Sequence, residues 1–215
     1  DGQSLVGTTT LGAGRGRVVR VSLEPDALAA GPDGWETLVP ERDDVIVACG
    51  PTATGLLLAT ESAASHSLWR LDADGNFVDD APVPLGAPIT IGAIETSARS
   101  TDSFAVVVSF TGPPSLWRIG SDGAVTPWAV PTASSLPALA VDVLTYPSVD
   151  GTEVGLFLVH RADVTPGPDT PTILNAYGGF NISSGPEWRP RIGAWCGAGG
   201  VYAIAGIRGG SEHGE

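Results

Sequence analysis

Lysine and methionine are both absent from this chain of 215 residues, and its eleven basic residues are all arginines. Because the chain lacks a methionine at its first position, we expect it to be a piece of a longer one. Its 24 acidic residues leave a formal net charge of −13 at pH 7. Nucleic acids and anionic membranes would repel such a chain, so neither is expected as a partner. The uncharged stretch between Arg191 and Arg208 is too short and too rich in glycine for a membrane span.

Cysteine and histidine are scarce. Cys49 and Cys196 lie far apart, both among apolar residues, and His66, His160 and His213 are equally scattered. No two of these residues have the spacing of a zinc site or a redox motif, so we expect neither a metal nor an organic cofactor. The cysteines are predicted to be buried free thiols, which agrees with a cytoplasmic protein.

Glycine and proline are abundant instead, with 29 and 18 residues. Both favour turns, and this density suits many short strands better than long helices. Hydrophobic residues make up 42% of the chain, which is typical of a globular protein with a core. The chain is therefore predicted to be globular and largely β.

Two segments of the first half resemble each other closely: "SLWRLDADGNF" from Ser67 and "SLWRIGSDGAV" from Ser115. A fainter third copy begins with "RVVRVSL" at Arg17. Each copy is predicted to be a short strand, an Asp-Gly turn of type I′ and a second strand. A repeat of roughly 40–50 residues built from short strands is typical of β-propeller blades. We expect a partial β-propeller of about three blades over residues 1–137; the alternative is a set of hairpins in an unrelated sandwich.

The pattern changes after residue 137. "LAVDVLTYPSVDGTEVGLFLVHR" from Leu139 predicts a long hairpin, and "TILNAYGG" from Thr172 predicts a short apolar strand. A helix is expected around residues 191–196, followed by a buried strand in "GVYAIAGI". Strand, helix and strand form a βαβ unit, so residues 138–215 are predicted to open an α/β domain.

Three motifs of the second half resemble those of a known protein family. "YPSVDGTEV" from Tyr146, "YGGFNIS" from Tyr177 and "RGGSEHGE" from Arg208 together resemble the prolyl oligopeptidases. The likeness is specific over residues 141–215 and general over the repeats. It implies a β-propeller followed by the N-terminal part of an α/β-hydrolase domain.

The resemblance also implies roles for two residues, and the two glycines between them suit a binding site. Tyr177 matches the tyrosine whose phenol donates a hydrogen bond to the oxyanion of the tetrahedral intermediate. Phe180 matches an aromatic residue of the pocket for proline, where a flat apolar ring suits a pyrrolidine. Gly178 and Gly179 would let the substrate backbone come close. Without the family, a tyrosine or phenylalanine beside two glycines would be read as core packing.

The chain also departs from the family pattern. Asn175 and Ala176 stand where the family has tyrosine and glycine, and Ser211 and His213 replace a glycine and a tyrosine. Ser211 and His213 do not match the family's triad either, because its serine, aspartate and histidine all follow the part of the family sequence that this chain matches. The 215 residues alone are expected to be inactive.

The implied activity is that of a serine peptidase that cleaves short peptides on the carboxyl side of proline. Short proline-containing peptides are thus the expected partners, as substrates. Three alternatives stay open: an oligopeptidase B-like enzyme that cuts after basic residues, another α/β-hydrolase such as an esterase, and a non-catalytic propeller that binds a partner. A backbone oxyanion loop of the HGGG type would favour an esterase, and the sequence has none.

Overall fold

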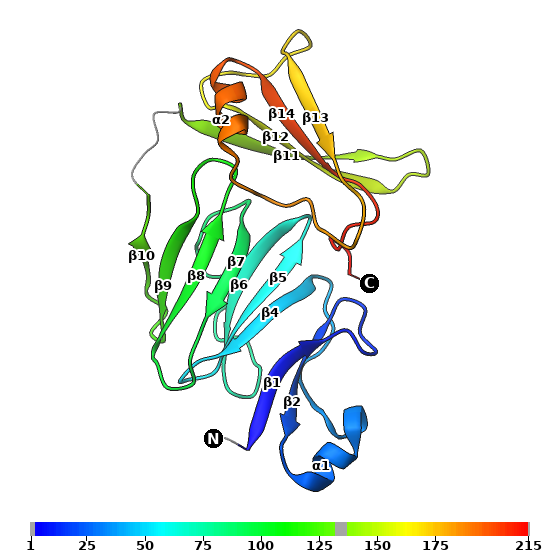
Figure 1. The fold of residues 1–215 in the computed structure, drawn as a ribbon, viewed down its shortest axis with the longest axis vertical. Helices are drawn as coiled ribbons and strands as arrows, with labels where there is room; N and C mark the ends of the chain where they lie inside the picture. Colours follow the sequence, from blue (N-terminus) through cyan, green and yellow to red (C-terminus); the bar gives the residue numbers. More distant parts are fainter. Residues whose placement is uncertain (1–2, 132–136, 215) are drawn as a thin grey trace.

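The computed structural model describes residues 3–131 and 137–214, which fold mostly into β-strands. The strands form four sheets, three of them antiparallel and one mixed. Figure 1 shows the mixed sheet lying across one end of the antiparallel sheets, which stand side by side. The candidate site lies where the mixed sheet meets them.

The first two sheets have three strands each. The first contains β1 (Ser4–Thr9), β2 (Arg17–Ser22) and β3 (Glu36–Val39), with α1 (Pro25–Ala29) and the short 3-10 helix η1 (Gly31–Gly34) between β2 and β3. The second contains β4 (Val45–Pro51), β5 (Leu56–Ser62) and β6 (Ser65–Leu71). Their apolar faces share one core, in which Val18 of β2 and Leu58 of β5 are fully buried.

The third sheet has four strands. They are β7 (Thr90–Glu95), β8 (Asp102–Val108), β9 (Ser115–Gly120) and β10 (Val125–Ala129), in the order β10-β9-β8-β7. This sheet packs on the second through a core that includes Leu57, Leu68 and Val107. The chain therefore alternates short antiparallel strands with turns throughout its first half, as its glycine and proline content predicts.

The two matching segments form the same turn but different second arms. In both, the glycine of the Asp-Gly pair adopts positive φ, +89° at Gly75 and +85° at Gly123. The predicted type I′ geometry is wrong, because that type needs positive φ at two successive residues and only the glycine has it. The later copy continues into β10, whereas the earlier one makes only a single bridge, between Leu71 and Phe77. Beyond this bridge the arm meets β6 through isolated backbone bonds, from the Val78 N–H to the Arg70 carbonyl at 3.0 Å and from the Val83 N–H to the Leu68 carbonyl at 2.7 Å.

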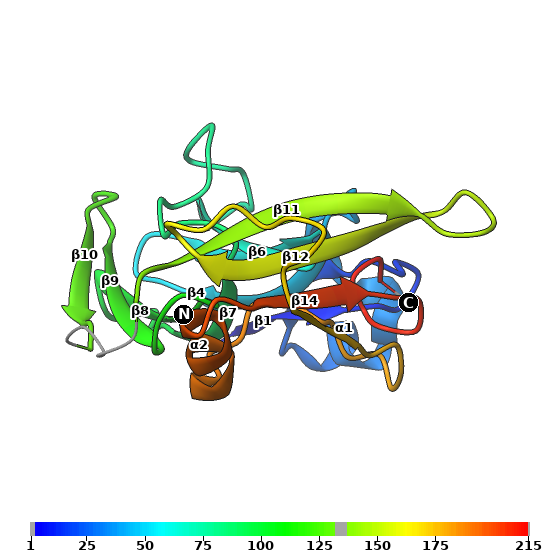
Figure 2. The same ribbon diagram turned by 90° about the horizontal axis from the view of Figure 1, so that it is seen from above.

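The mixed sheet comes from the second half. Its strands are β11 (Leu139–Pro147), β12 (Glu153–Arg161), β13 (Thr172–Ala176) and β14 (Val201–Gly206), in the order β11-β12-β14-β13. β11 and β12 form the predicted hairpin, whose tip projects past the other strands in Figure 2. β13 and β14 are parallel, with α2 (Pro190–Gly197) between them, which confirms the βαβ unit.

α2 and the mixed sheet share a core that also reaches the first half of the chain. Ile192 and Cys196 of α2 pack with Phe157 of β12, and Phe110 and Ala64 join them from loops of the antiparallel sheets. The two halves of the molecule are thus held together by buried apolar contact.

The two cysteines are free, but they differ in burial. Cys196 is buried, as predicted, whereas Cys49 on β4 is only partly covered. Burial raises the pKa of the Cys49 thiol to about 11, so it stays protonated at neutral pH. In the described part of the chain, no helix has the length and apolar content to cross a membrane.

The predicted domain boundary after residue 137 falls beside residues 132–136, which lie outside the described residues. β10 before them belongs to the third antiparallel sheet and β11 after them to the mixed sheet. A division into two domains at this point stays a prediction.

Candidate functional site

Tyr177 directly follows β13, at the end toward which the parallel strands β13 and β14 both run. In α/β sheets, ligands bind outside the carboxyl ends of parallel strands. The Tyr177 side chain is 45% exposed, so its phenol is accessible rather than buried in a core. The sheet therefore presents an anchored phenol at the edge where a ligand is expected.

Gly178 fixes the course of the chain after Tyr177. A Cβ at Gly178 would lie 2.2 Å from the carbonyl oxygen of Arg208, which follows β14. In return, a Cβ at Gly209 would lie 2.3 Å from the carbonyl oxygen of Gly178. The Asn181 N–H then donates to the Gly209 carbonyl at 3.2 Å. The two motifs "YGGFN" and "RGG" thus pack backbone against backbone, which only glycine permits at these two positions.

Phe180 lies in a different environment from Tyr177. Its side chain is 89% exposed, and both Phe180 and Asn181 have φ of +55°. Left-handed backbone is uncommon for a non-glycine residue and rare for a bulky one, so this turn is strained. Phe180 is thus more exposed than Tyr177, and its place in a pocket for proline stays a prediction.

A cavity of about 280 Å³ lies beside Tyr177, between the two halves of the molecule. His66 and Thr90 line it from the antiparallel sheets, and Asn175, Tyr177 and Arg189 line it from the second half. Phe180, Gly178 and Gly179 do not border it. Gly179 nevertheless lies near the tyrosine, because a Cβ built on it would be 3.7 Å from the Tyr177 ring.

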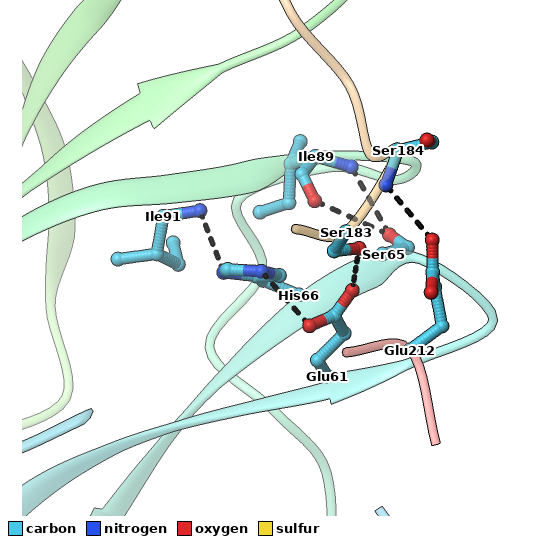
Figure 3. A network of polar contacts seen from close by, with 8 residues as sticks. All are labelled: Glu61, Ser65, His66, Ile89, Ile91, Ser183, Ser184 and Glu212. Atoms are coloured by element: carbon cyan, nitrogen blue, oxygen red, sulfur yellow. Dashed lines mark hydrogen bonds and ion pairs between the residues drawn. The ribbon is translucent and has the colours of Figure 1, made fainter. Parts of the chain in front are cut away.

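A buried polar network lies next to this cavity and joins both halves (Figure 3). The Ser183 hydroxyl donates to Oε1 of Glu61 at the end of β5, and Oε2 of the same carboxylate lies 3.8 Å from Nε2 of His66. The Ile91 N–H donates to Nδ1 of His66 at 3.1 Å. Because Nδ1 accepts this bond, the neutral ring carries its hydrogen on Nε2, which faces Glu61.

Burial shifts both titratable groups of this network toward their neutral forms. Desolvation raises the pKa of Glu61; the Ser183 hydrogen bond opposes the shift, and the nearby carboxylate of Glu212 adds to it. Desolvation lowers the pKa of His66. The pair is therefore not a strong ion pair, since each partner is discouraged from ionising.

The order of the groups in this network rules out a catalytic triad. In a triad the histidine accepts the serine proton and the acid holds the histidine. Here the carboxylate of Glu61 lies between Ser183 and His66, and the far nitrogen of His66 is engaged by the backbone. The Ser183 hydroxyl donates to a carboxylate and not to a histidine, so these three residues do not form the serine-histidine-acid order that activates a triad serine.

A second carboxylate holds the next serine. Oε1 of Glu212 accepts the Ser184 N–H at 2.9 Å, and the Ser184 hydroxyl donates to the carbonyl oxygen of Tyr177 at 3.2 Å. Glu212 is 7% exposed. The motif "RGGSEHGE" therefore contributes its first glutamate to the site; Ser211 and His213 on either side of it do not join these bonds.

Arg208 links the site to the tip of the β11–β12 hairpin. Its guanidinium donates to Asp150 in the hairpin turn and, at 3.4 Å, to the hydroxyl of Ser148. The hydrogen bond from Arg208 to Asp150 lowers the pKa of Asp150 to about 2, and the bond from the Thr152 N–H to the same carboxylate contributes to this shift. The side chains are exposed, so solvent screens the pair and it orients the hairpin more than it stabilises the fold.

Metal ligands do not cluster in this region. Within residues 3–131 and 137–214, no group of three or more histidine, cysteine, aspartate or glutamate side chains is arranged to hold a metal ion. The chemistry that these groups offer is hydrogen bonding from the Tyr177 phenol and anchoring of its loop.

Comparison with known proteins places the chain among peptidases. No family model matches it. It is 25% identical over 218 residues to a prolyl endopeptidase of Elizabethkingia miricola, across 100% of this chain and 30% of that protein. It is 32% identical over 195 residues to the prolyl oligopeptidase ophP of Omphalotus olearius, across 85% of this chain and 25% of that protein. A solved structure from a structural and mechanistic study of two prolyl endopeptidases matches with a TM-score of 0.84 and 30% identity, over 100% of this chain and 31% of that one.

These matches confirm the resemblance carried by the three motifs. The chain belongs to the prolyl oligopeptidase family. It spans about 30% of the length of these relatives.

Proposed function

We propose that this chain is part of a serine peptidase that hydrolyses short peptides on the carboxyl side of proline. The observation that carries the proposal is the position of Tyr177, at the carboxyl end of β13 and beside a cavity between the two halves. In this role the phenol donates to the oxyanion that forms when a serine attacks the carbonyl carbon of the proline residue. The serine, its histidine and its aspartate belong to parts of the whole protein other than this chain.

The fold is interpreted accordingly. In this proposal the three antiparallel sheets of residues 1–137 are blades of a β-propeller, and residues 138–215 begin the α/β-hydrolase domain. The side-by-side arrangement of the sheets and the βαβ unit support it. The free cysteines support a cytoplasmic location, where thiols stay reduced.

The other predicted site residues take supporting roles. The strained turn at Phe180 holds its ring out in solvent, which suits a residue that packs on the proline ring of a bound peptide. Gly178 and Gly179 bring the tyrosine and this turn together without side chains in the way.

The test is Tyr177→Phe in the whole protein, assayed with a chromogenic peptide that carries proline before the scissile bond. Loss of one oxyanion donor is expected to lower kcat by about 100- to 1,000-fold with little change in KM. Tyr146→Phe is the matched control, because Tyr146 is a partly exposed tyrosine of β11 that does not border the cavity.

Each alternative predicts a different result. Unchanged kcat in Tyr177→Phe would refute the oxyanion role. Faster cleavage after arginine or lysine than after proline would favour the oligopeptidase B-like alternative, and preference for a simple ester over the peptide would favour an esterase. A whole protein that binds peptides and hydrolyses none of these substrates would favour the binding module.

A further inference from the structure

The loop that follows Tyr177 turns back and bonds to it. Seven residues after the tyrosine, the Ser184 hydroxyl donates to the Tyr177 carbonyl oxygen at 3.2 Å. A bond to this carbonyl restrains the peptide plane on which the tyrosine is mounted, at the point where β13 has ended and no ladder bond does so. The orientation of the phenol therefore depends on where Ser184 is held.

Ser184 is held by Glu212. The backbone N–H of Ser184 donates to Oε1 of this buried carboxylate at 2.9 Å. The absence of a side chain at Gly210 makes room for this carboxylate, since a Cβ there would lie 2.1 Å from its Oε2; a Cβ at Gly206 would make an ordinary contact of 3.6 Å with its Oε1.

The neighbouring serine is held from the other half of the molecule. Ser183 donates to Glu61 on β5, so two consecutive serines are hydrogen-bonded to two carboxylates from distant parts of the chain (Figure 3). Burying two carboxylates close together costs free energy, and Glu212 indeed raises the pKa of Glu61. Apolar packing would close this loop at lower cost, which points to placement rather than stability as the role of these bonds.

We propose that Ser184, anchored by Glu212, is a positioning residue that orients Tyr177 for its role as oxyanion donor. This inference rests on the function proposed above. Neither Ser184 nor Glu212 touches the reacting atoms in it; both act through the tyrosine.

The test is Ser184→Ala in the whole protein. Loss of the hydroxyl should lower kcat for the proline substrate by about 10- to 100-fold, because small displacements of a catalytic group have effects of this size, while KM stays within about twofold. Ser184→Thr, which keeps a hydroxyl, should restore kcat. Ser109→Ala is the control, since its hydroxyl makes an exposed hydrogen bond with that of Thr111, away from the loop that follows Tyr177.

A double variant separates positioning from general damage. If Ser184 acts only through the phenol, Ser184→Ala should cause no further loss of kcat in a Tyr177→Phe background. Equal losses in both backgrounds, an unchanged kcat in Ser184→Ala, or an effect on KM alone would overturn the inference. An unchanged kcat in Tyr177→Phe itself would instead refute the proposed function, so the two failures are distinguishable.

Glu212 provides a second route if Ser184→Ala does not fold. Glu212→Gln keeps an oxygen that can accept the Ser184 N–H, whereas Glu212→Ala removes it. We expect near-normal kcat in the glutamine variant and a loss of about 10-fold or more in the alanine variant. Equal activity of these two variants would overturn the anchoring role.

Discussion

Gly178→Ala should disrupt the contact between the two glycine motifs. A Cβ at this position would lie 2.2 Å from the Arg208 carbonyl oxygen and 2.7 Å from Cγ1 of Ile207. Ordinary contact begins at 3.4 Å, so one backbone must move by about 1.2 Å. Neither obstacle lies at the end of a flexible chain, because one is backbone and the other is the first branch of a β-branched residue.

The expected cost follows from this displacement. Overpacking of a filled site typically costs about 1–3 kcal/mol, and a backbone obstacle places Gly178→Ala in the upper part of that range. Because Tyr177 precedes the glycine, a shift of about 1 Å should also lower kcat by up to about 100-fold. Stability and activity should therefore fall together.

Gly179→Ala is the matched control. A Cβ there would meet only the Tyr177 ring, at an ordinary contact distance of 3.7 Å, and φ is outside the left-handed region. Its stability should change by less than about 1 kcal/mol, and alanine can even stabilise such a site by restricting the unfolded chain. Urea unfolding followed by tryptophan fluorescence compares the two variants. If Gly178→Ala is as stable as Gly179→Ala, the interlocked packing of the two motifs is wrong.

Two further predictions concern stability. Glu61 has a raised pKa in the folded protein, so its favourable contribution is present at low pH and is lost as pH rises above its usual value of 4.5. Glu61→Gln should therefore gain thermal stability relative to the parent protein as pH rises from 4 to 8, and an unchanged difference in melting temperature across this range would contradict this. Leu58→Ala should lower the free energy of unfolding by about 2–5 kcal/mol, because Leu58 is fully buried. Leu174→Ala should lower it by less than about 0.5 kcal/mol, because Leu174 is 67% exposed. Similar losses for the two variants in urea titrations would contradict the core assignment.

The fold of the second half was predictable because its signals are local. Period-two alternation on either side of Asp150-Gly151 specifies the hairpin, and the glycines after Tyr177 and around α2 mark the ends of elements. The first half was predictable as strands and turns, but not in detail. The arm after Leu71 forms no continuous strand like β10, although the two sequence patterns match. It meets β6 through isolated backbone bonds, and its Asp79 pairs with Arg70 of β6.

The site was only half predictable. Tyr177 and the glycines beside it stand in recognisable motifs. Glu61 and His66 do not: a lone glutamate at the end of the apolar strand "LLLATES" reads as a surface residue, and its partner Ser183 is 122 positions away. A buried carboxylate of this kind becomes visible only when the fold brings its donors to it. Glu212 belongs to the motif "RGGSEHGE", but its distance along the chain from Ser184 does not indicate that the two residues bond.

The polar network explains how one site can depend on both halves of the chain. Ser183 and Ser184 are adjacent, so the loop cannot release Glu61 without straining the bond that Ser184 makes to Tyr177. A displacement of the antiparallel sheets relative to the mixed sheet would therefore shift Tyr177 through its links to Ser183 and Ser184. If the halves separate, the bond from Ser183 to Glu61 on β5 must break. Glu61→Gln weakens the bond to Ser183 and leaves Ser184 unchanged. A change in kcat in this variant would therefore reveal coupling between the two halves.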